Sequence, residues 1–170
     1  MNLRTYPDPV LRHKTGRVET VGPEERAILD KMAETMYLTQ GVGLAATQVG
    51  LDRQFAVVNV GDGLIKMINP IITKQEGKET QEEGCLSSPG VTVKVTRARR
   101  ITVQFLNENG EVCELKADGL LARAIQHELD HLAGVNIIDY LHPLKRALAT
   151  RRLKAARSRQ AKKTSRRKKT

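Results

Sequence analysis

Residues 126–131 read Gln-His-Glu-Leu-Asp-His, and the interpretation of the whole chain depends on this stretch. Two histidines four positions apart lie one turn above each other on a helix, so His127 and His131 could bind a single metal ion. Glu128 would then lie beside that ion, where its carboxylate could exchange a proton with a water molecule. A helix can also carry His-Glu-x-x-His by chance, as two ordinary surface or core histidines. The pentapeptide therefore predicts a metal site only if a third ligand can be found.

That third ligand has to come from elsewhere in the chain, because a hydrolytic metal site usually has three protein ligands and a water. The metzincin spacing would place a histidine at position 137, but this residue is Ile137. A thermolysin-like arrangement would need a downstream glutamate, and no acidic residue follows Asp139. Asp139 itself lies near the expected helix end and is a weak candidate. We therefore expect the third ligand upstream of the helix.

The chain contains two cysteines, which lie in different surroundings. Cys113 lies in an alternating, strand-like segment, where a buried and inert thiol is the expected role. Cys85 follows Gly84 and lies close to Pro89, where the backbone can turn and direct a side chain. On chemistry alone, Cys85 could equally well be a metal ligand or an ordinary buried thiol.

Residues 41–48 read Gly-Val-Gly-Leu-Ala-Ala-Thr-Gln and are rich in small side chains. A phosphate-binding loop would need a Gly-Lys-Ser/Thr ending and a preceding strand, and both are missing here. Small residues let a backbone approach a substrate closely, and the amide of Gln48 could donate a hydrogen bond to a developing oxyanion. The alternative is purely structural, a tight turn in which Gly41 ends the preceding helix.

Taken together, three segments of the chain resemble the motifs of the peptide deformylase family. Residues 41–48 resemble its first motif, residues 83–87 (Glu-Gly-Cys-Leu-Ser) its second and residues 126–131 its third, in the same order. The resemblance extends from about Tyr6 to Pro143. It implies a metallohydrolase that removes the N-formyl group from the first methionine of nascent polypeptides and releases formate.

The same resemblance implies roles for individual residues. Cys85, His127 and His131 would hold one divalent ion, which is Fe2+ in many members, with Zn2+ or another divalent ion as the alternative. The side chain of Gln48 and the backbone N–H of Leu86 would polarise the formyl oxygen. The residues expected to contact the substrate are Val42, Gly43, Gly84, Leu120 and Ala124.

The chain departs from the family pattern at three places. Residues 91–93 (Val-Thr-Val) occur where many bacterial members carry a basic residue. Gln81 and Arg123 occur where some members have aliphatic pocket residues. These departures leave the reaction chemistry intact but change the size and polarity of the side-chain pocket. Because Leu120 and Ala124 still provide an apolar lining, we expect methionine as the first residue of the substrate.

The composition is that of a single domain in a reducing compartment. The 170 residues suffice for one hydrophobic core. The first twenty residues contain no apolar run typical of a signal peptide, and no stretch approaches the roughly 20 apolar residues that span a bilayer. Two cysteines far apart in the sequence do not suggest a disulfide framework. We therefore expect a cytoplasmic monomer without membrane contact.

The hydrophobic patterns predict an α+β fold. A helix is expected to begin at Pro23 and to end at Gly41. A second helix is expected to begin after Asp118, to carry the His-Glu-x-x-His pattern and to end at Gly134. Strands are expected at residues 54–60, 64–69, 91–95, 101–105 and 112–116, with hairpin turns at 61–63 and 109–110. The expected architecture is small antiparallel strands and hairpins packed around a central metal-binding helix.

Positive charge is concentrated at the C-terminal end. Residues 142–170 contain 13 Lys or Arg and no acidic residue, whereas the rest of the chain contains 16 basic and 19 acidic residues. We expect a catalytic domain over residues 1–143 and a basic helix and tail over residues 144–170. Leu141, Leu144 and Leu148 are spaced to lay a short helix against the body, with about a dozen disordered residues after it. The tail could be only a solubilising extension, but its charge bias favours contact with ribosomal RNA.

Overall fold

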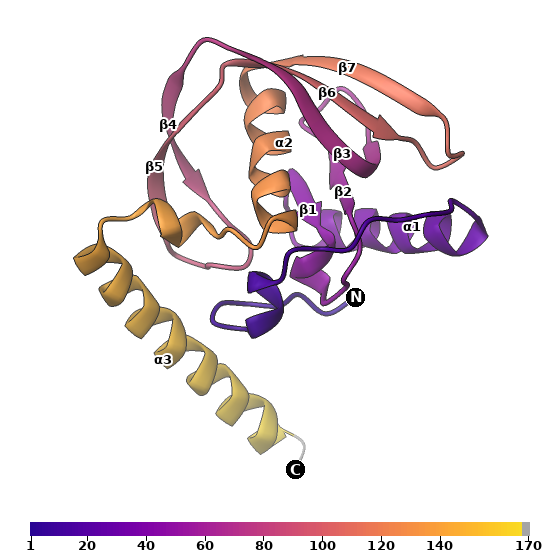
Figure 1. The fold of residues 1–170 in the computed structure, drawn as a ribbon. Helices are drawn as coiled ribbons and strands as arrows, with labels where there is room; N and C mark the ends of the chain where they lie inside the picture. The colour runs from indigo at the N-terminus through magenta and orange to yellow at the C-terminus, as the bar shows by residue number, and fades with distance from the viewer. Residues whose placement is uncertain (168–170) are drawn as a thin grey trace.

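The computed structural model describes the backbone of residues 1–167 and the side chains of residues 1–159. A central helix, α2 (Gly119–Leu132), is surrounded by strands and packs on a five-stranded antiparallel sheet of order β1-β2-β3-β6-β7 (Figure 1). A two-stranded sheet, β4-β5, lies beside the same helix. This arrangement confirms the predicted α+β fold. The strands are β1 (Gly43–Ala45), β2 (Phe55–Val58), β3 (Ile65–Glu76), β4 (Glu79–Gly84), β5 (Thr92–Arg97), β6 (Arg100–Leu106) and β7 (Val112–Asp118).

The first long helix, α1 (Pro23–Leu38), begins where the sequence predicts, and the Gly22 N–H donates a hydrogen bond to the Glu25 carboxylate at 2.9 Å. Leu29, Met32 and Met36 form its fully buried face. The expectation that this helix ends at Gly41 is wrong, because it ends three residues earlier, at Leu38. The residue in the left-handed conformation is Gln40, with φ of 56°, so the chain leaves the helix before the glycine.

Strand β3 is longer than the predicted segment and pairs with two neighbours, β2 and β6. Its register with β6 shifts between Ile68 and Ile71, at Asn69 and Pro70. Proline cannot donate a ladder hydrogen bond, so it falls at an irregularity and does not end the strand. The amide of Asn69 also bonds both backbone groups of Val18, at 2.9 and 2.8 Å, which ties the N-terminal segment to the sheet.

The predicted hairpin at Asn109–Gly110 is confirmed as the turn between β6 and β7, and Gly110 has a φ of 80°. Asp118 precedes α2 as expected, but its side chain makes no capping hydrogen bond. At the other end Gly134, with φ of 76°, follows the last turn, as predicted. Cys113 in β7 is half-buried, so the expectation of a buried thiol is wrong.

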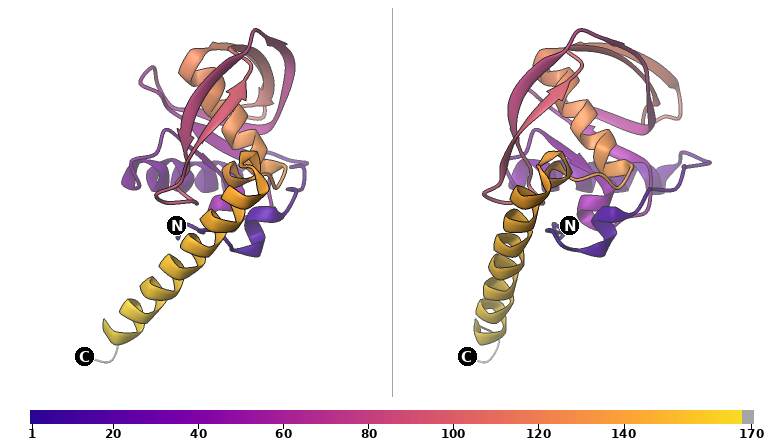
Figure 2. Two further views of the ribbon diagram at one scale, coloured as in Figure 1. Left: turned by 90° about the vertical axis from the view of Figure 1, so that its left-hand side faces the viewer. Right: turned by 60° about the vertical axis from the view of Figure 1, so that its left-hand side comes forward.

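The C-terminal helix, α3 (Pro143–Arg167), follows a short 3-10 helix, η3 (Ile137–Tyr140), and projects away from the body (Figure 2). The expectation that Leu144 and Leu148 pack against the body is wrong, because they are 73% and 56% exposed. Ala149 and Leu153 are buried there instead.

Ion pairs explain which face of α3 turns inward. Arg146 lies 3.7 Å from Asp139, and Arg157 lies 3.2 Å from Asp8. These two arginines share a helical face with the buried Ala149 and Leu153, and only one face of a straight helix can contact the body. The helix is also longer than expected, and residues 168–170 lie outside the described residues. Among the described helices, none is long and apolar enough to cross a membrane.

Candidate active site

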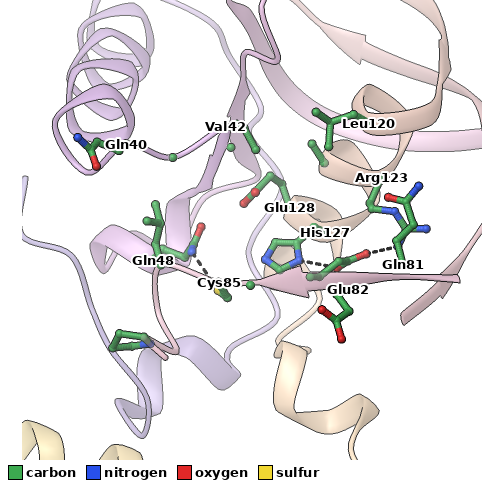
Figure 3. Close-up of a pocket in the computed structure, with 17 residues that line it drawn as sticks. Gln40, Val42, Gln48, Gln81, Glu82, Cys85, Leu120, Arg123, His127 and Glu128 are labelled. Atoms are coloured by element: carbon green, nitrogen blue, oxygen red, sulfur yellow. Dashed lines mark hydrogen bonds and ion pairs between the residues drawn. The ribbon is translucent and has the colours of Figure 1, made fainter. Parts of the chain in front are cut away.

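Three potential metal ligands converge at the end of β4 and on one face of α2. Two of them, Cys85 and His127, are labelled in Figure 3. Cys85 follows β4 directly, and His127 and His131 lie one turn apart on the helix. One donor atom from each lies within 4.8 Å of the other two, and Cys85 Sγ is 3.2 Å from His131 Nε2. The structure thus brings together the three residues that the sequence singled out. A thiolate and two imidazoles are donors suited to Zn2+ or Fe2+.

The electrostatics of the two histidines differ. Burial lowers the pKa of His131, which keeps its ring in the neutral form that binds a metal. Burial alone would also lower the pKa of His127, but its interactions with Cys85 and Glu83 raise that pKa to about 10. A metal binding here would therefore displace a proton from His127.

Glu83 orients His127, and sequence reasoning missed this role. Its carboxylate accepts a hydrogen bond from His127 Nδ1 at 3.0 Å. It also accepts hydrogen bonds from the guanidinium groups of Arg97 and Arg123, each at 2.6 Å. Burial by itself would raise the pKa of Glu83, but these three partners lower it to about 2. A carboxylate behind a ligating histidine fixes the orientation of the ring and the position of its proton.

Glu128 lies beside the ligands but is directed away from them, into the cavity (Figure 3). It is buried, and its Oε2 has no hydrogen-bond partner among the described residues. Burial raises its pKa to about 7. A buried carboxyl group that titrates near neutrality and has a free oxygen can accept and return a proton.

The side chain of Gln48 provides a hydrogen-bond donor beside the ligands. Gln48 lies in the 3-10 helix η2 (Ala46–Val49) and is almost fully buried. Its Oε1 accepts from the Ala45 N–H at 2.8 Å, which directs its Nε2 towards Ser87 Oγ at 3.2 Å and Cys85 Sγ at 3.7 Å. For the backbone N–H of Leu86, the described part of the chain offers no hydrogen-bond partner. Two donors can therefore serve an oxygen atom bound near the ligands.

Most of these groups line a cavity of about 470 Å³, namely Gln48, Glu83, Cys85, Leu86, His127 and Glu128. The five residues expected to contact a substrate all contribute to its wall: Val42, Gly43, Gly84, Leu120 and Ala124. Gln81 and Arg123, which depart from the family pattern, line it as well. The cavity therefore combines two of the metal ligands, a proton-transfer group, hydrogen-bond donors and a partly apolar wall, as hydrolysis of a small amide requires.

Comparison with known proteins gives one consistent result. The family model described as polypeptide deformylase matches residues 1–147. The peptide deformylase of Halothermothrix orenii is 49% identical over 141 residues, which is 82% of this chain and 92% of that protein. That of Xylella fastidiosa is 48% identical over 160 residues, 91% of this chain and 94% of the relative. The crystal structure of peptide deformylase from Ehrlichia chaffeensis superimposes with a TM-score of 0.91 at 38% identity, covering 95% of this chain and 98% of that one. The same enzyme in complex with actinonin gives 0.90 at 40% identity, covering 92% and 96%.

Proposed function

This chain belongs to the peptide deformylase family, and from that premise we propose how its own residues carry out the reaction. It is a metallohydrolase that removes the N-formyl group from nascent polypeptides. The observation that carries this function is the convergence of Cys85, His127 and His131 beside the buried carboxyl group of Glu128.

Cys85, His127 and His131 would hold the metal ion, and we propose Fe2+ as the native metal. When bound, a divalent ion supplies Lewis acidity, which activates water and polarises the formyl oxygen. The donor set of one sulfur and two nitrogens fits this ion, and Zn2+ equally. Glu83 would keep His127 oriented through its Nδ1.

Glu128 would accept the proton of the attacking water and deliver it to the departing amine, because it lines the cavity and its Oε2 has no hydrogen-bond partner among the described residues. The Nε2 of Gln48 and the backbone N–H of Leu86 would stabilise the negative charge that develops on the formyl oxygen. Gln48 is held for this task by the Ala45 N–H, so little reorganisation is needed during the reaction.

The peptide part of the substrate would lie along the open edges of two strands. Val42 and Gly43 are at β1, an edge strand of the larger sheet, and Gly84 ends β4. Edge strands offer backbone groups that can pair with an extended peptide. Leu120 and Ala124 would contact the first side chain, which favours methionine. All of these residues come from one chain, which supports a monomer as the active form, and we propose that it acts in the cytoplasm.

Formate release decides between this function and its alternatives. We would purify the protein anaerobically, measure its metal and offer it formyl-Met-Ala, acetyl-Met-Ala and Met-Ala. Hydrolysis of the formylated peptide alone is the expected result. Cleavage of internal peptide bonds would instead indicate a metallopeptidase, and the absence of any hydrolysis would indicate a binding protein with a structural metal.

A substitution at Gly43 should disable Glu128 although residue 128 itself is unchanged. A Cβ atom at position 43 would lie 2.3 Å from Glu128 Oε1, so Gly43→Ala must displace that carboxylate. We expect kcat for formyl-Met-Ala to fall by roughly 10²-fold, as misplacement of a catalytic group by about 1 Å can cause. Metal content should stay stoichiometric, since Glu128 is not a ligand. Gly16→Ala is the matched control, because its Cβ would meet no atom closer than 3.9 Å. Equal turnover by the two variants would contradict the assigned position of Glu128.

We further propose that residues 1–143 form the catalytic unit and that the basic helix α3 contacts ribosomal RNA. The contact is supported by five exposed basic side chains on the described part of α3, namely Lys145, Arg151, Arg152, Lys154 and Arg159. The partners of Arg146 and Arg157 are acidic residues of the body, so these two hold the helix in place. The rest of the molecule has more acidic than basic residues, so a phosphate-rich surface would attract only this helix.

Neutralising α3 should weaken ribosome binding while leaving turnover of short peptides intact. Deletion of the helix is unsuitable as a test, since it would also remove the buried Ala149 and Leu153. We therefore choose four substitutions by glutamine, at Lys145, Arg151, Arg152 and Lys154. Removal of each positive charge that binds a phosphate should make the slope of log K against log salt shallower by roughly 0.7 to 0.9, measured by co-sedimentation. The control removes the same charge from the body, at Lys14, Arg17, Lys31 and Lys94, and should bind like the wild type. Equal weakening in both variants would show that only net charge matters.

A further inference from the structure

The end of the cavity opposite Gln48 carries two polar side chains, Gln81 and Arg123, close to Leu120 (Figure 3). The proposed function places the first side chain of the substrate at this end, next to Leu120 and Ala124. A purely apolar lining would suit an apolar side chain such as that of methionine. The polar pair therefore has to be explained by what each side chain can still bind.

Arg123 is already committed to the protein. Its NH1 donates to Glu83 Oε1 at 2.6 Å and to the Val95 carbonyl at 3.0 Å, and its NH2 donates to the Glu79 carbonyl at 2.8 Å. The side chain is buried, so its aliphatic part forms a section of the cavity wall while its terminal nitrogens point at β4 and β5. Arg123 is thus a structural part of the cavity.

Gln81 is in the opposite situation. Side chains alternate along a strand, so Gln81 points to the same side of β4 as the buried Glu83, towards α2. It is exposed, it lines the cavity, and in the described part of the chain its amide has no hydrogen-bond partner. An amide carries two N–H donors and an acceptor oxygen. The cavity therefore presents one uncommitted polar group where the first side chain would end.

We infer that Gln81 is a specificity-determining residue that allows the enzyme to deformylate chains beginning with oxidised methionine. The inference rests on the proposed function. Oxidation converts the apolar thioether of methionine into a polar sulfoxide whose oxygen accepts hydrogen bonds. An apolar pocket would reject that group, because burial of a polar oxygen without a partner is unfavourable. The Nε2 of Gln81 supplies the missing donor. The reaction remains hydrolysis of the formyl group, and the sulfoxide is neither oxidised nor reduced.

Three peptides separate polarity from shape: formyl-Met-Ala, its methionine sulfoxide form, and formyl-norleucine-Ala, which lacks the sulfur. For each we would measure kcat/KM with the wild type and with Gln81→Leu. The ratio of kcat/KM for the sulfoxide to that for norleucine should fall about tenfold in Gln81→Leu, as expected for loss of one hydrogen bond. Gln75→Leu is the matched control, since Gln75 is an exposed glutamine on β3 that does not line this cavity. It should leave the ratio unchanged.

The outcomes distinguish this inference from the proposed function. If the wild type hydrolyses none of the three peptides, the proposed function fails. If it hydrolyses formyl-Met-Ala but the ratio is the same in wild type and Gln81→Leu, only the inference is overturned. It is also overturned if the wild type prefers methionine over the sulfoxide by more than roughly 10²-fold, the discrimination typical of a pocket without a polar partner.

Discussion

Cys85→Ala is expected to lose its metal and, with it, all measurable hydrolysis of formyl peptides. The substitution removes the only sulfur donor of the ligand set and leaves two histidines, which cannot hold a divalent ion tightly. Loss of a group that merely supports a ligand lowers metal affinity by roughly 10- to 100-fold, so loss of the ligand itself should exceed that range. The measurement is metal content after dialysis against a chelator, together with formate release before and after metal is added back.

Cys113→Ala is the matched control for this prediction. Cys113 is half-buried on β7, outside the cavity, and the hydrogen bond of its thiol among the described residues is to the Glu111 carbonyl, at 3.7 Å. Its replacement should preserve both metal content and turnover. A Cys85→Ala protein with stoichiometric metal and normal activity would instead show that the ligand set has been assigned incorrectly.

The helical half of the site could be predicted from spacing alone. Residues four apart on a helix share a face, so the formation of α2 alone brings His127 and His131 together. Cys85 was different, because its position depends on how β4 packs against α2. No local pattern specifies that contact, and on chemistry alone Cys85 remained ambiguous. Only its place within three ordered motifs singled it out.

The network around Glu83 could not be predicted, for a related reason. Strand β4 reads Glu-Thr-Gln-Glu-Glu-Gly and has no apolar alternation, so its sequence does not indicate a strand. The inward-facing Glu83 is polar because it meets Arg97, Arg123 and His127 instead of a hydrophobic core. A strand stabilised by such pairing becomes recognisable only when its partners in β5 and α2 are in place.

The error at α3 illustrates a limit of helical periodicity. Leu144 and Leu148 form one plausible apolar stripe, and Ala149 and Leu153 form another. Each stripe contains too few apolar side chains for amphipathicity to predict which one is buried. The choice is made by ion pairs with Asp8 and Asp139, which come from segments far away in the sequence. Periodicity therefore predicted the helix but not its orientation.

Glu128→Gln should keep the metal and the fold but lose most of kcat. Glutamine has nearly the same shape, so the buried site stays filled, while the side chain can no longer take up a proton. General acid–base catalysis contributes roughly 10²- to 10⁴-fold, and the loss should lie in the upper part of that range because Glu128 serves both proton transfers. Metal analysis and kcat for formyl-Met-Ala test this directly. A variant within tenfold of the wild type would remove Glu128 from the proton-transfer role.

The pH dependence of activity in the wild type and in Glu128→Gln provides a second test of the role of Glu128. Burial raises the pKa of Glu128 to about 7 in the metal-free protein, and only its ionised form can accept a proton. Activity of the wild type should therefore fall as the pH drops through the pKa of this group. The positive charge of a bound divalent ion stabilises the carboxylate, so the fall should begin at or below pH 7 in the metal-loaded enzyme. Glu128→Gln lacks the titrating group and should show no such acid limb in kcat/KM. An unchanged acid limb in the variant would assign that titration to another residue.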